Sequence, residues 1–512
     1  MEEGVAPRSS AGAGEGERRV SEDGHVDVIV IGAGLSGIGA AWHLQRRCPG
    51  HRYVILEARE AIGGTWDLFR YPGVRSDSDM HTLGYAFRPW AGAKAIADGA
   101  SIRDYIEETA RENDIARHIR FGHRVTAASW SSRAARWTVA VQRGDGTTAV
   151  LTCDWLHWCS GYFDYARGHS PAFPGEHDFA GRIVHPQFWP ADFDQAGQRV
   201  VVIGSGATAV TLVPSLAKSA AHVTMLQRSP TYMVSRSSRD RFADRLRRIL
   251  PERLAYAVTR WKNVLIGMAF FRLSRARPQR VARRLIAMAE AALPPGYDVA
   301  THLTPRYKPW DQRLCLIPDG DLFEAIRDGR ATIETGTIER FTRDGILLSS
   351  GRELKADVIV TATGLELSLL GGAAVSVDGV PLTLGDALQY KGMMFADVPN
   401  LSFTFGYTNA SWTLKADLVA TYLTRLLATM RKRGWRKATP RTGDKPLQRK
   451  PFADFTSGYI QRVADRLPKQ GSRRPWRLNQ NYVHDLLALR LGSVMTDMEF
   501  TCPIGDEAGT AG

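Results

Sequence analysis

Residues 26–44, which read VDVIVIGAGLSGIGAAWHL, decide the fold of this 512-residue chain. The apolar run at 28–31 is typical of a strand buried in a parallel sheet. Gly32, Gly34 and Gly37 follow it at the spacing of a phosphate-binding turn, and a helical pattern begins directly after them. The glycines allow a tight turn, a close backbone approach to a pyrophosphate and close packing of helix on strand. This stretch therefore predicts a dinucleotide-binding unit.

The second strand of this unit is expected at residues 53–57 and ends on an acid. Glu57 stands twenty residues after Gly37. A carboxylate at the end of the second strand binds ribose hydroxyls. The first nucleotide is therefore predicted to lack a 2′-phosphate.

The same unit recurs at residues 199–216, RVVVIGSGATAVTLVPSL, with Gly204, Gly206 and Ala209 in the phosphate turn. Its second strand, at residues 222–227, leads into Arg228 and Ser229, with no acid at the matching place. An arginine pairs with a 2′-phosphate that a carboxylate would repel. The second nucleotide is therefore predicted to be NADPH.

These units predict an α/β chain with two Rossmann-like dinucleotide-binding domains. Two further segments, 154–161 and 357–364, each run from an Asp through an apolar strand to a Gly. We assign the second of them to the first domain, so the NADPH domain is expected to be inserted in the other domain. The predicted parts are a disordered tail at 1–25, a discontinuous first domain at 26–165 and 355–500, and an NADPH domain at 166–354. A helical insertion is expected at 232–295.

Composition excludes several classes of protein. The five cysteines form no C-x-x-C pair and no cluster with histidine, which argues against a zinc site, a disulfide framework and a flavin disulfide reductase. The longest apolar run, near residues 264–271, is far shorter than the roughly 20 residues of a spanning helix. The tail at 1–25 contains acids and lacks an apolar core, so we expect a cytoplasmic protein without a signal peptide.

The net charge of +14 is concentrated in one segment. Residues 236–290 contain fifteen Lys or Arg and four Asp or Glu. Arginines mixed with Leu246, Ile249, Leu265 and Phe270 favour the hypothesis of peripheral contact with an anionic membrane. A solvated helical insertion covering the active site is the slightly favoured alternative, because helix faces are commonly charged. No nucleic-acid partner is expected.

Two longer motifs bear on the class of enzyme. Residues 63–77, GGTWDLFRYPGVRSD, match the pattern [AG]-G-x-W-x-x-x-x-[FY]-P-[GM]-x-x-x-D. Residues 179–190, FAGRIVHPQFWP, match F-x-G-x-x-x-H-x-x-x-W-[PD] and stand just before the second phosphate turn. With these motifs the chain resembles the class B flavoprotein monooxygenases and, among them, the Baeyer–Villiger branch. Further stretches, including residues 309–316 and 406–417, are similar to actinobacterial members of that family.

The resemblance implies FAD in the first domain, NADPH in the second, O2 as co-substrate and a small ketone or sulfur compound as substrate. It also places an active-site arginine, Arg313, above the flavin and pairs it with Asp77, although nothing local shows that the two residues meet. His185 is expected at a hinge or cofactor contact rather than as a core histidine. Trp66 and Trp189 also fit simple core positions. Besides the five glycines, the predicted cofactor-binding residues are Ser36, Glu57, Thr65, Trp66, Asp67, Leu68, Arg75, Ser76, Asp77, Val125, His185, Ser205, Ala207, Thr208, Ala209, Val210, Arg228 and Ser229.

One residue departs from the family pattern. Several members have a lysine immediately before the active-site arginine, where this chain has Gln312. We therefore expect Arg228 and Ser229 to carry more of the 2′-phosphate recognition. The predicted reaction is insertion of oxygen next to a carbonyl, with oxygenation of sulfides or thioamides as a side activity. The alternatives are an N- or S-oxygenase, against which Trp189 and Pro190 argue, and a nucleotide-binding sensor without turnover.

Overall fold

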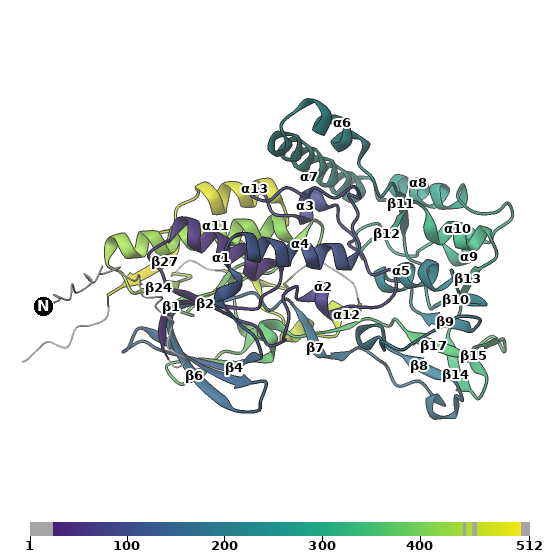
Figure 1. Cartoon of the computed structure of the whole chain (residues 1–512), viewed down its shortest axis with the longest axis horizontal. Coiled ribbons are helices and arrows are strands. Elements are labelled where there is room, and N and C mark those ends of the chain that lie inside the picture. The colour runs from purple at the N-terminus through teal and green to yellow at the C-terminus, as the bar shows by residue number, and fades with distance from the viewer. Residues whose placement is uncertain (1–23, 444–446, 453–457, 503–512) are drawn as a thin grey trace, which may run out of the picture.

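The computed structural model describes residues 24–443, 447–452 and 458–502, and builds them around two separate sheets (Figure 1). Most of the tail predicted at 1–25 lies outside the described residues, but His25 begins the first strand. The two sheets confirm the predicted α/β class. Helices α6 and α7 project from the body at the top of Figure 1, beside the region where the two halves meet.

The first sheet has the strand order β20-β19-β4-β5-β6-β1-β2-β3, with β23 also paired to β6. Its β1, β2, β3, β6 and β23 run parallel, while β4, β5 and β6 form antiparallel hairpins. The strand bounds are β1 His25–Ile31, β2 Tyr53–Leu56, β3 Ile119–Arg120, β4 His123–Ser131, β5 Arg136–Arg143, β6 Thr148–Trp158, β19 Ala374–Val377, β20 Val380–Pro381 and β23 Leu401–Phe403.

The second sheet is wholly parallel, in the order β13-β10-β9-β17-β8. Its strands are β8 Arg182–Val184, β9 Arg199–Ile203, β10 His222–Gln227, β13 Ala331–Thr335 and β17 Val358–Thr361. Six smaller sheets complete the strands: β7 Phe163–Gly168 with β18 Leu365–Leu367, β11 Met233–Arg236 with β12 Cys315–Pro318, β14 Ile338–Thr342 with β15 Gly345–Leu348 and β16 Glu353–Lys355, β21 Gln389–Tyr390 with β22 Met394–Phe395, β24 Lys437–Pro440 with β27 Met498–Thr501, and β25 Arg449–Lys450 with β26 Gln470–Gly471.

The position of β17 corrects the predicted boundary at residue 355. The sequence pattern assigns this strand to the first domain, but it pairs with β9 and β8 in the second sheet. β17 lies beside β9 in the second sheet as β6 lies beside β1 in the first. The similar segments 154–161 and 357–364 therefore belong to different sheets. The chain returns to the first sheet only at β19, after the antiparallel pair β7–β18 has carried it between the two halves.

Helices cover both sheets. They are α1 Leu35–Arg47, α2 Thr65–Leu68, α3 Met80–Leu83, α4 Gly99–Glu112, α5 Ala207–Leu216, α6 Arg241–Ile249, α7 Glu252–Ala276, α8 Pro278–Glu290, α9 Val299–His302, α10 Asp321–Arg327, α11 Trp412–Arg433, α12 Gly458–Gln461 and α13 Tyr482–Leu486. The insertion predicted at 232–295 is helical only from α6 to α8, since residues 233–236 form β11.

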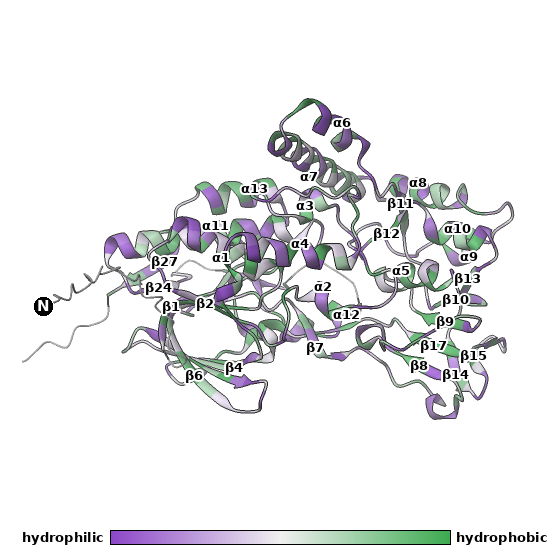
Figure 2. Ribbon diagram, in the orientation of Figure 1, coloured by the Kyte–Doolittle hydropathy of each residue, from purple (hydrophilic) through white to green (hydrophobic). Residues whose placement is uncertain are grey.

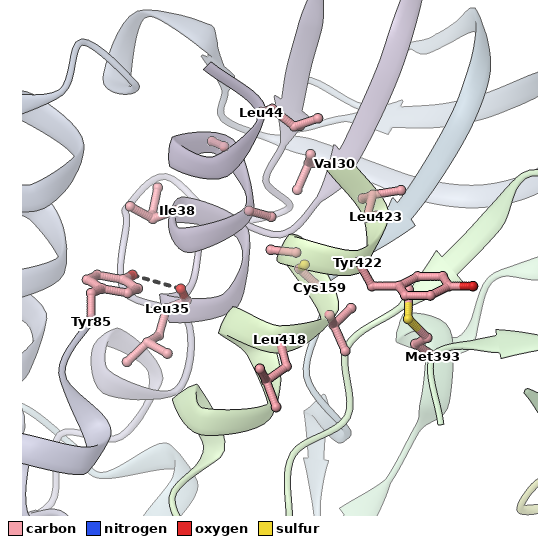
Figure 3. Close-up of a cluster of buried hydrophobic side chains, with 14 of the residues drawn as sticks. Val30, Leu35, Ile38, Leu44, Tyr85, Cys159, Met393, Leu418, Tyr422 and Leu423 are labelled. Carbon is pink, nitrogen blue, oxygen red and sulfur yellow. Dashed lines mark hydrogen bonds between the residues drawn. The ribbon is translucent and has the colours of Figure 1, made fainter. Parts of the chain in front are cut away.

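The main core of the first half lies between α1 and α11. Figure 3 shows the two helices side by side with buried apolar side chains from both, among them Leu44, Leu418 and Leu423. His43 and Asp417 join the same helices by a 2.8 Å contact between Nε2 and Oδ1. In Figure 2 the helices of this half carry both apolar and hydrophilic segments. Among the described residues, the helices are each too short or too polar to cross a membrane.

Candidate active site

A cavity of about 1180 Å³ lies where the two halves meet. Single-ligand pockets are typically about 300–1,000 Å³, so this one is large enough to be shared by a cofactor and a substrate. Its wall combines the first phosphate turn, the first turn of α5, the inner side of α7 and the segments 310–316, 407–414 and 479–482. The first phosphate turn, the motif at 63–77 and both halves of the chain therefore contribute to one site.

The first phosphate turn has the geometry that a dinucleotide requires. Gly32 has φ +104°, and a Cβ there would lie 2.7 Å from the Cys159 carbonyl oxygen. A Cβ on Gly37 would lie 1.9 Å from the Gly32 carbonyl oxygen, so only glycine allows this packing of α1 on the turn. Gly34 precedes α1 and lines the cavity, which leaves the helix N-terminus facing it. This is the expected cradle for a pyrophosphate.

Glu57 lies at the end of β2, on the cavity wall. Its carboxylate accepts hydrogen bonds from the Ala33 amide at 2.7 Å and the Arg59 amide at 2.9 Å. Burial raises the pKa of this carboxyl above its ordinary value, against the pull of the two amides and the Arg59 charge. The position fits the ribose contact predicted for it, and the bonds to the turn also hold Glu57 in place.

Some of the predicted residues in the motif at 63–77 line the cavity, and others do not. Thr65, Trp66, Arg75, Ser76 and Val125 line it, as does Ser36, whose hydroxyl accepts from the Trp412 indole at 2.7 Å.

Asp67 and Leu68, also predicted to bind the cofactor, are buried and stand outside the cavity wall. Their amides donate to the Gly64 carbonyl. Burial alone would raise the pKa of the Asp67 carboxyl, but the Arg59 and Arg70 guanidiniums hold it below its ordinary value. Asp67 therefore positions Arg59, which does line the cavity.

Arg313 and Asp77 meet on the cavity wall, although 236 residues separate them in sequence. The distance from Arg313 Nη1 to Asp77 Oδ2 is 2.8 Å, and the side chains are 39% and 43% exposed. This is the pair that the resemblance implied. Arg75, close to Asp77 in sequence, pairs with Asp321 at the start of α10, so the loop that carries Asp77 is tied to the second half.

The second phosphate turn repeats the first. Gly204 has φ +133°, and a Cβ there would lie 2.3 Å from the Ala362 carbonyl oxygen. Gly206 precedes α5 with φ −79° and ψ −174°, the same values as Gly34 before α1. Ala207 and Thr208 line the large cavity, whereas Gly204, Ser205, Gly206, Ala209 and Val210 stand outside its wall.

The predicted phosphate-binding residues follow β10. Arg228 and Ser229 are exposed at its end. The Ser205 hydroxyl lies 3.3 Å from the Ser229 carbonyl oxygen and 3.0 Å from the Thr231 hydroxyl, which fixes this loop beside the second turn. The loop that carries Arg228 and Ser229 therefore lies next to the turn that would bind the pyrophosphate.

His185 lies at the connection between the halves and away from the cavity wall. A Cβ on Gly168, the last residue of β7, would be 2.0 Å from its Cε1 atom. Burial lowers the pKa of His185. The structure therefore favours a hinge position over direct contact with the cavity. Trp189 packs edge-on against Phe193 with 5.1 Å between ring centroids, as a core aromatic would.

Among the cavity residues that sequence reasoning missed are Asp79, Asn263 and Trp412. Asp79 Oδ1 accepts from Asn263 Nδ2 at 2.9 Å and caps α3 through the Thr82 amide. Asp79 stands two residues after Asp77, and its capping position before α3 was the only local signal. The contact from α7 could not be read from the sequence.

A buried ion pair holds the C-terminal part of the wall. Lys415 Nζ lies 2.7 Å from Asp485 Oδ2, which also accepts from the Tyr407 hydroxyl at 2.9 Å. Removing one partner of a buried pair leaves an uncompensated charge and destabilises by about 3–5 kcal/mol.

Lys415→Met should therefore lower the thermal unfolding midpoint clearly, while Lys355→Met, at an exposed pair, should leave it unchanged. Lys415→Met combined with Asp485→Leu should recover much of the loss, because no lone charge then remains buried. Equal midpoints for Lys415→Met and the wild type would refute this role.

Comparisons with known proteins agree with this geometry. Residues 95–271 match the family model for flavin-binding monooxygenase-like proteins, and residues 30–91 match that for NAD(P)-binding Rossmann-like domains. The chain is 55% identical to the FAD-containing monooxygenase EthA of Mycobacterium tuberculosis, over 92% of this chain and 96% of the relative. It is 46% identical to the probable FAD-binding monooxygenase AlmA of Acinetobacter sp, over 91% and 94%.

Solved structures share the fold. OTEMO in complex with FAD and NADP gives a TM-score of 0.73 at 20% identity, over 93% of this chain and 99% of that one. Cyclohexanone monooxygenase from Rhodococcus sp. Phi1, bound to NADP+, gives 0.70 at 21% identity, over 82% and 87%. The expected similarity to an actinobacterial flavin monooxygenase is confirmed. Together with the two phosphate turns, of which the first lines the cavity and the second adjoins it through the first residues of α5, it shows that the chain belongs to the FAD-containing flavin monooxygenases.

Proposed function

We propose that the chain is an NADPH-dependent Baeyer–Villiger monooxygenase that converts a ketone to an ester or lactone, and that it also oxygenates sulfides or thioamides. The observation that supports this proposal best is the Arg313–Asp77 pair on the wall between the two cradles. When bound, FAD supplies the oxygenating chemistry, drawing on a hydride from NADPH and on O2. The residues of the chain bind and orient the reactants, stabilise the developing charge and exclude water.

Arg313 supplies the positive charge of the site. Attack of an oxygen nucleophile on a carbonyl builds negative charge on oxygen, and a preorganised cation stabilises that charge most where water is scarce. Asp77 accepts from one guanidinium nitrogen and thereby orients the group. Aromatic residues of the same wall, such as Trp66 and Phe271, would help to exclude water from the reacting atoms.

The second candidate is an N- or S-oxygenase, which the match to the flavin-binding monooxygenase-like model favours. Trp189 and Pro190 in the second motif argue for the Baeyer–Villiger branch. Steady-state assays on a ketone and on a thioether of similar size separate the two. The proposal expects ester from the ketone with kcat/KM at least equal to that for sulfoxide. Sulfoxide without detectable ester would support the second candidate.

We also propose a preference for NADPH over NADH, based on Arg228 and Ser229 beside the second turn. A hydrogen bond to a charged group contributes about 1.5–3 kcal/mol. Arg228→Ala should thus raise KM for NADPH about tenfold to a hundredfold and leave KM for NADH nearly unchanged.

Arg330→Ala is the matched control, because Arg330 precedes β13 at the opposite end of the same sheet. It should change neither constant. Equal losses for both coenzymes in Arg228→Ala would show that Arg228 has a structural role instead.

A further inference from the structure

The outer side of α7 exposes a stripe of large apolar side chains. Leu254, Val258, Trp261 and Leu265 follow one another at helical spacing and are 50%, 39%, 41% and 53% exposed, respectively. Such a stripe normally packs against the body of a protein. Nine of the fifteen exposed large hydrophobic residues among those described lie in α6 to α8: Phe242, Ile249, Leu254, Val258, Trp261, Leu265, Ile266, Leu273 and Met288.

Exposed arginines surround this stripe. Arg245 and Arg248 of α6 and Arg253 of α7 are exposed beside its first residues, and Arg272 and Arg275 follow its last. Figure 2 shows apolar and hydrophilic segments alternating along the projecting helices. We call the exposed side chains of residues 241–275 the docking face. Apolar side chains flanked by cations are typical of helices that lie in the interface of an anionic bilayer.

The helix that carries this face is firmly attached to the body. The buried Arg260 donates from Nη1 to the carbonyl oxygens of His81 at 2.7 Å and Gly84 at 2.8 Å. Asn263 donates to Asp79. These contacts lie on the inner side of α7, whereas the apolar stripe follows the opposite side of the helix. Trp261 of the stripe also packs against Tyr482, with 5.8 Å between ring centroids.

The inner side of the same helix lines the active-site cavity. Val264, Gly267, Met268 and Phe271 belong to its wall. Ile266 belongs to the wall and is also 54% exposed, so the cavity wall continues into the docking face. An apolar molecule dissolved in a bilayer under this face would reach the cavity along one helix.

We propose that α6 and α7 dock on an anionic lipid bilayer and that the site takes long-chain apolar carbonyl compounds from it. The substrate part rests on the proposed function, whereas the docking part does not. A second copy of the chain is a poorer occupant, because pairing two such faces would bring two strongly positive segments together.

Docking is tested by co-sedimentation of the FAD-loaded protein with vesicles of phosphatidylglycerol and phosphatidylcholine, and with vesicles of phosphatidylcholine alone. Binding to the anionic vesicles should be strong at low salt and should weaken as salt screens the charges. Arg245→Gln, Arg248→Gln and Arg253→Gln together should weaken it about a hundredfold, since each arginine near the surface contributes about fivefold. Leu254→Glu, Val258→Glu and Leu265→Glu together should also abolish it.

The matched control replaces Arg133, Arg340 and Arg343, which are exposed on the two sheets away from α7, by glutamine. It changes the net charge equally and should bind as the wild type does. Equal binding by all variants, or no binding to anionic vesicles, would overturn the proposal. The proposal would also be overturned if the protein self-associated without lipid and both the arginine and the apolar triple variants abolished that association. The docking face would then join two copies of the chain.

The substrate part is tested with the same variants and two ketones. They should oxidise a short water-soluble ketone at the wild-type rate, which also shows that they are folded, and should be slowed on a long-chain ketone carried in anionic vesicles. Equal rates on the vesicle-borne ketone would refute delivery from the bilayer. Failure of the wild type on both ketones would instead count against the proposed function and leave the docking result standing.

Discussion

Arg313→Ala should reduce ester formation by about 10²–10³, the usual effect of losing one donor to a developing oxyanion. FAD should stay bound, because the Gly32–Gly37 turn and Glu57 make their contacts elsewhere on the wall. NADPH should still be oxidised, since hydride transfer depends on ring stacking more than on this cation. Much of the O2 consumed should then leave as hydrogen peroxide. Parallel measurement of ester, NADPH and peroxide checks this expectation.

Asp77→Ala should resemble Arg313→Ala if the carboxylate acts by orienting the guanidinium. The double variant should then be little worse than either single variant, because residues that act as a unit are not additive. Arg275→Ala is the matched control, since Arg275 forms a 2.7 Å pair with Asp311 but stands outside the cavity wall. A near-normal ester yield per NADPH in Arg313→Ala would show that another group stabilises the charge.

Gly37→Ala should remove FAD from the protein. The new Cβ would lie 1.9 Å from the Gly32 carbonyl oxygen, closer than any real contact, so the phosphate turn must move. Overpacking of this kind costs about 1–3 kcal/mol or more, so FAD affinity should fall at least about fivefold.

Flavin absorbance per protein after purification measures this loss directly. Gly267→Ala is the control, because a Cβ on this α7 glycine would have open space around it. It should retain the flavin. Full flavin content in Gly37→Ala would mean that FAD does not depend on this turn.

Local patterns predicted both cradles, because strand, turn and helix are contiguous, and Gly32, Gly37 and Gly204 stand where a Cβ would clash with a backbone carbonyl oxygen. They misplaced the strand at 358–361, since a short apolar strand looks the same in either sheet and its neighbours decide where it pairs. The resemblance supplied the Arg313–Asp77 pair, which no local pattern could show across 236 residues.

The motif around Trp66 predicted proximity to the cofactor but not the direction of each side chain. Asp67 turns toward Arg59 and Arg70, two nearby cations whose pairing with it could have been considered from the sequence. The role of α7 was less accessible. Its arginines and apolar residues were visible as composition, but the side that lines the cavity and the side left exposed were defined only by its contacts with Asp79, His81 and Gly84.

An enzyme with this cavity should insert one oxygen atom from O2 next to a carbonyl group. Incubation of the FAD-loaded protein with NADPH, a panel of ketones of increasing chain length and ¹⁸O₂ tests it most directly, with mass detection of the products. The account predicts an ester or lactone that contains one labelled oxygen atom, formed from wild-type protein and nearly lost in Arg313→Ala. NADPH consumption with no labelled ester from any ketone, together with labelled sulfoxide from a thioether, would contradict it.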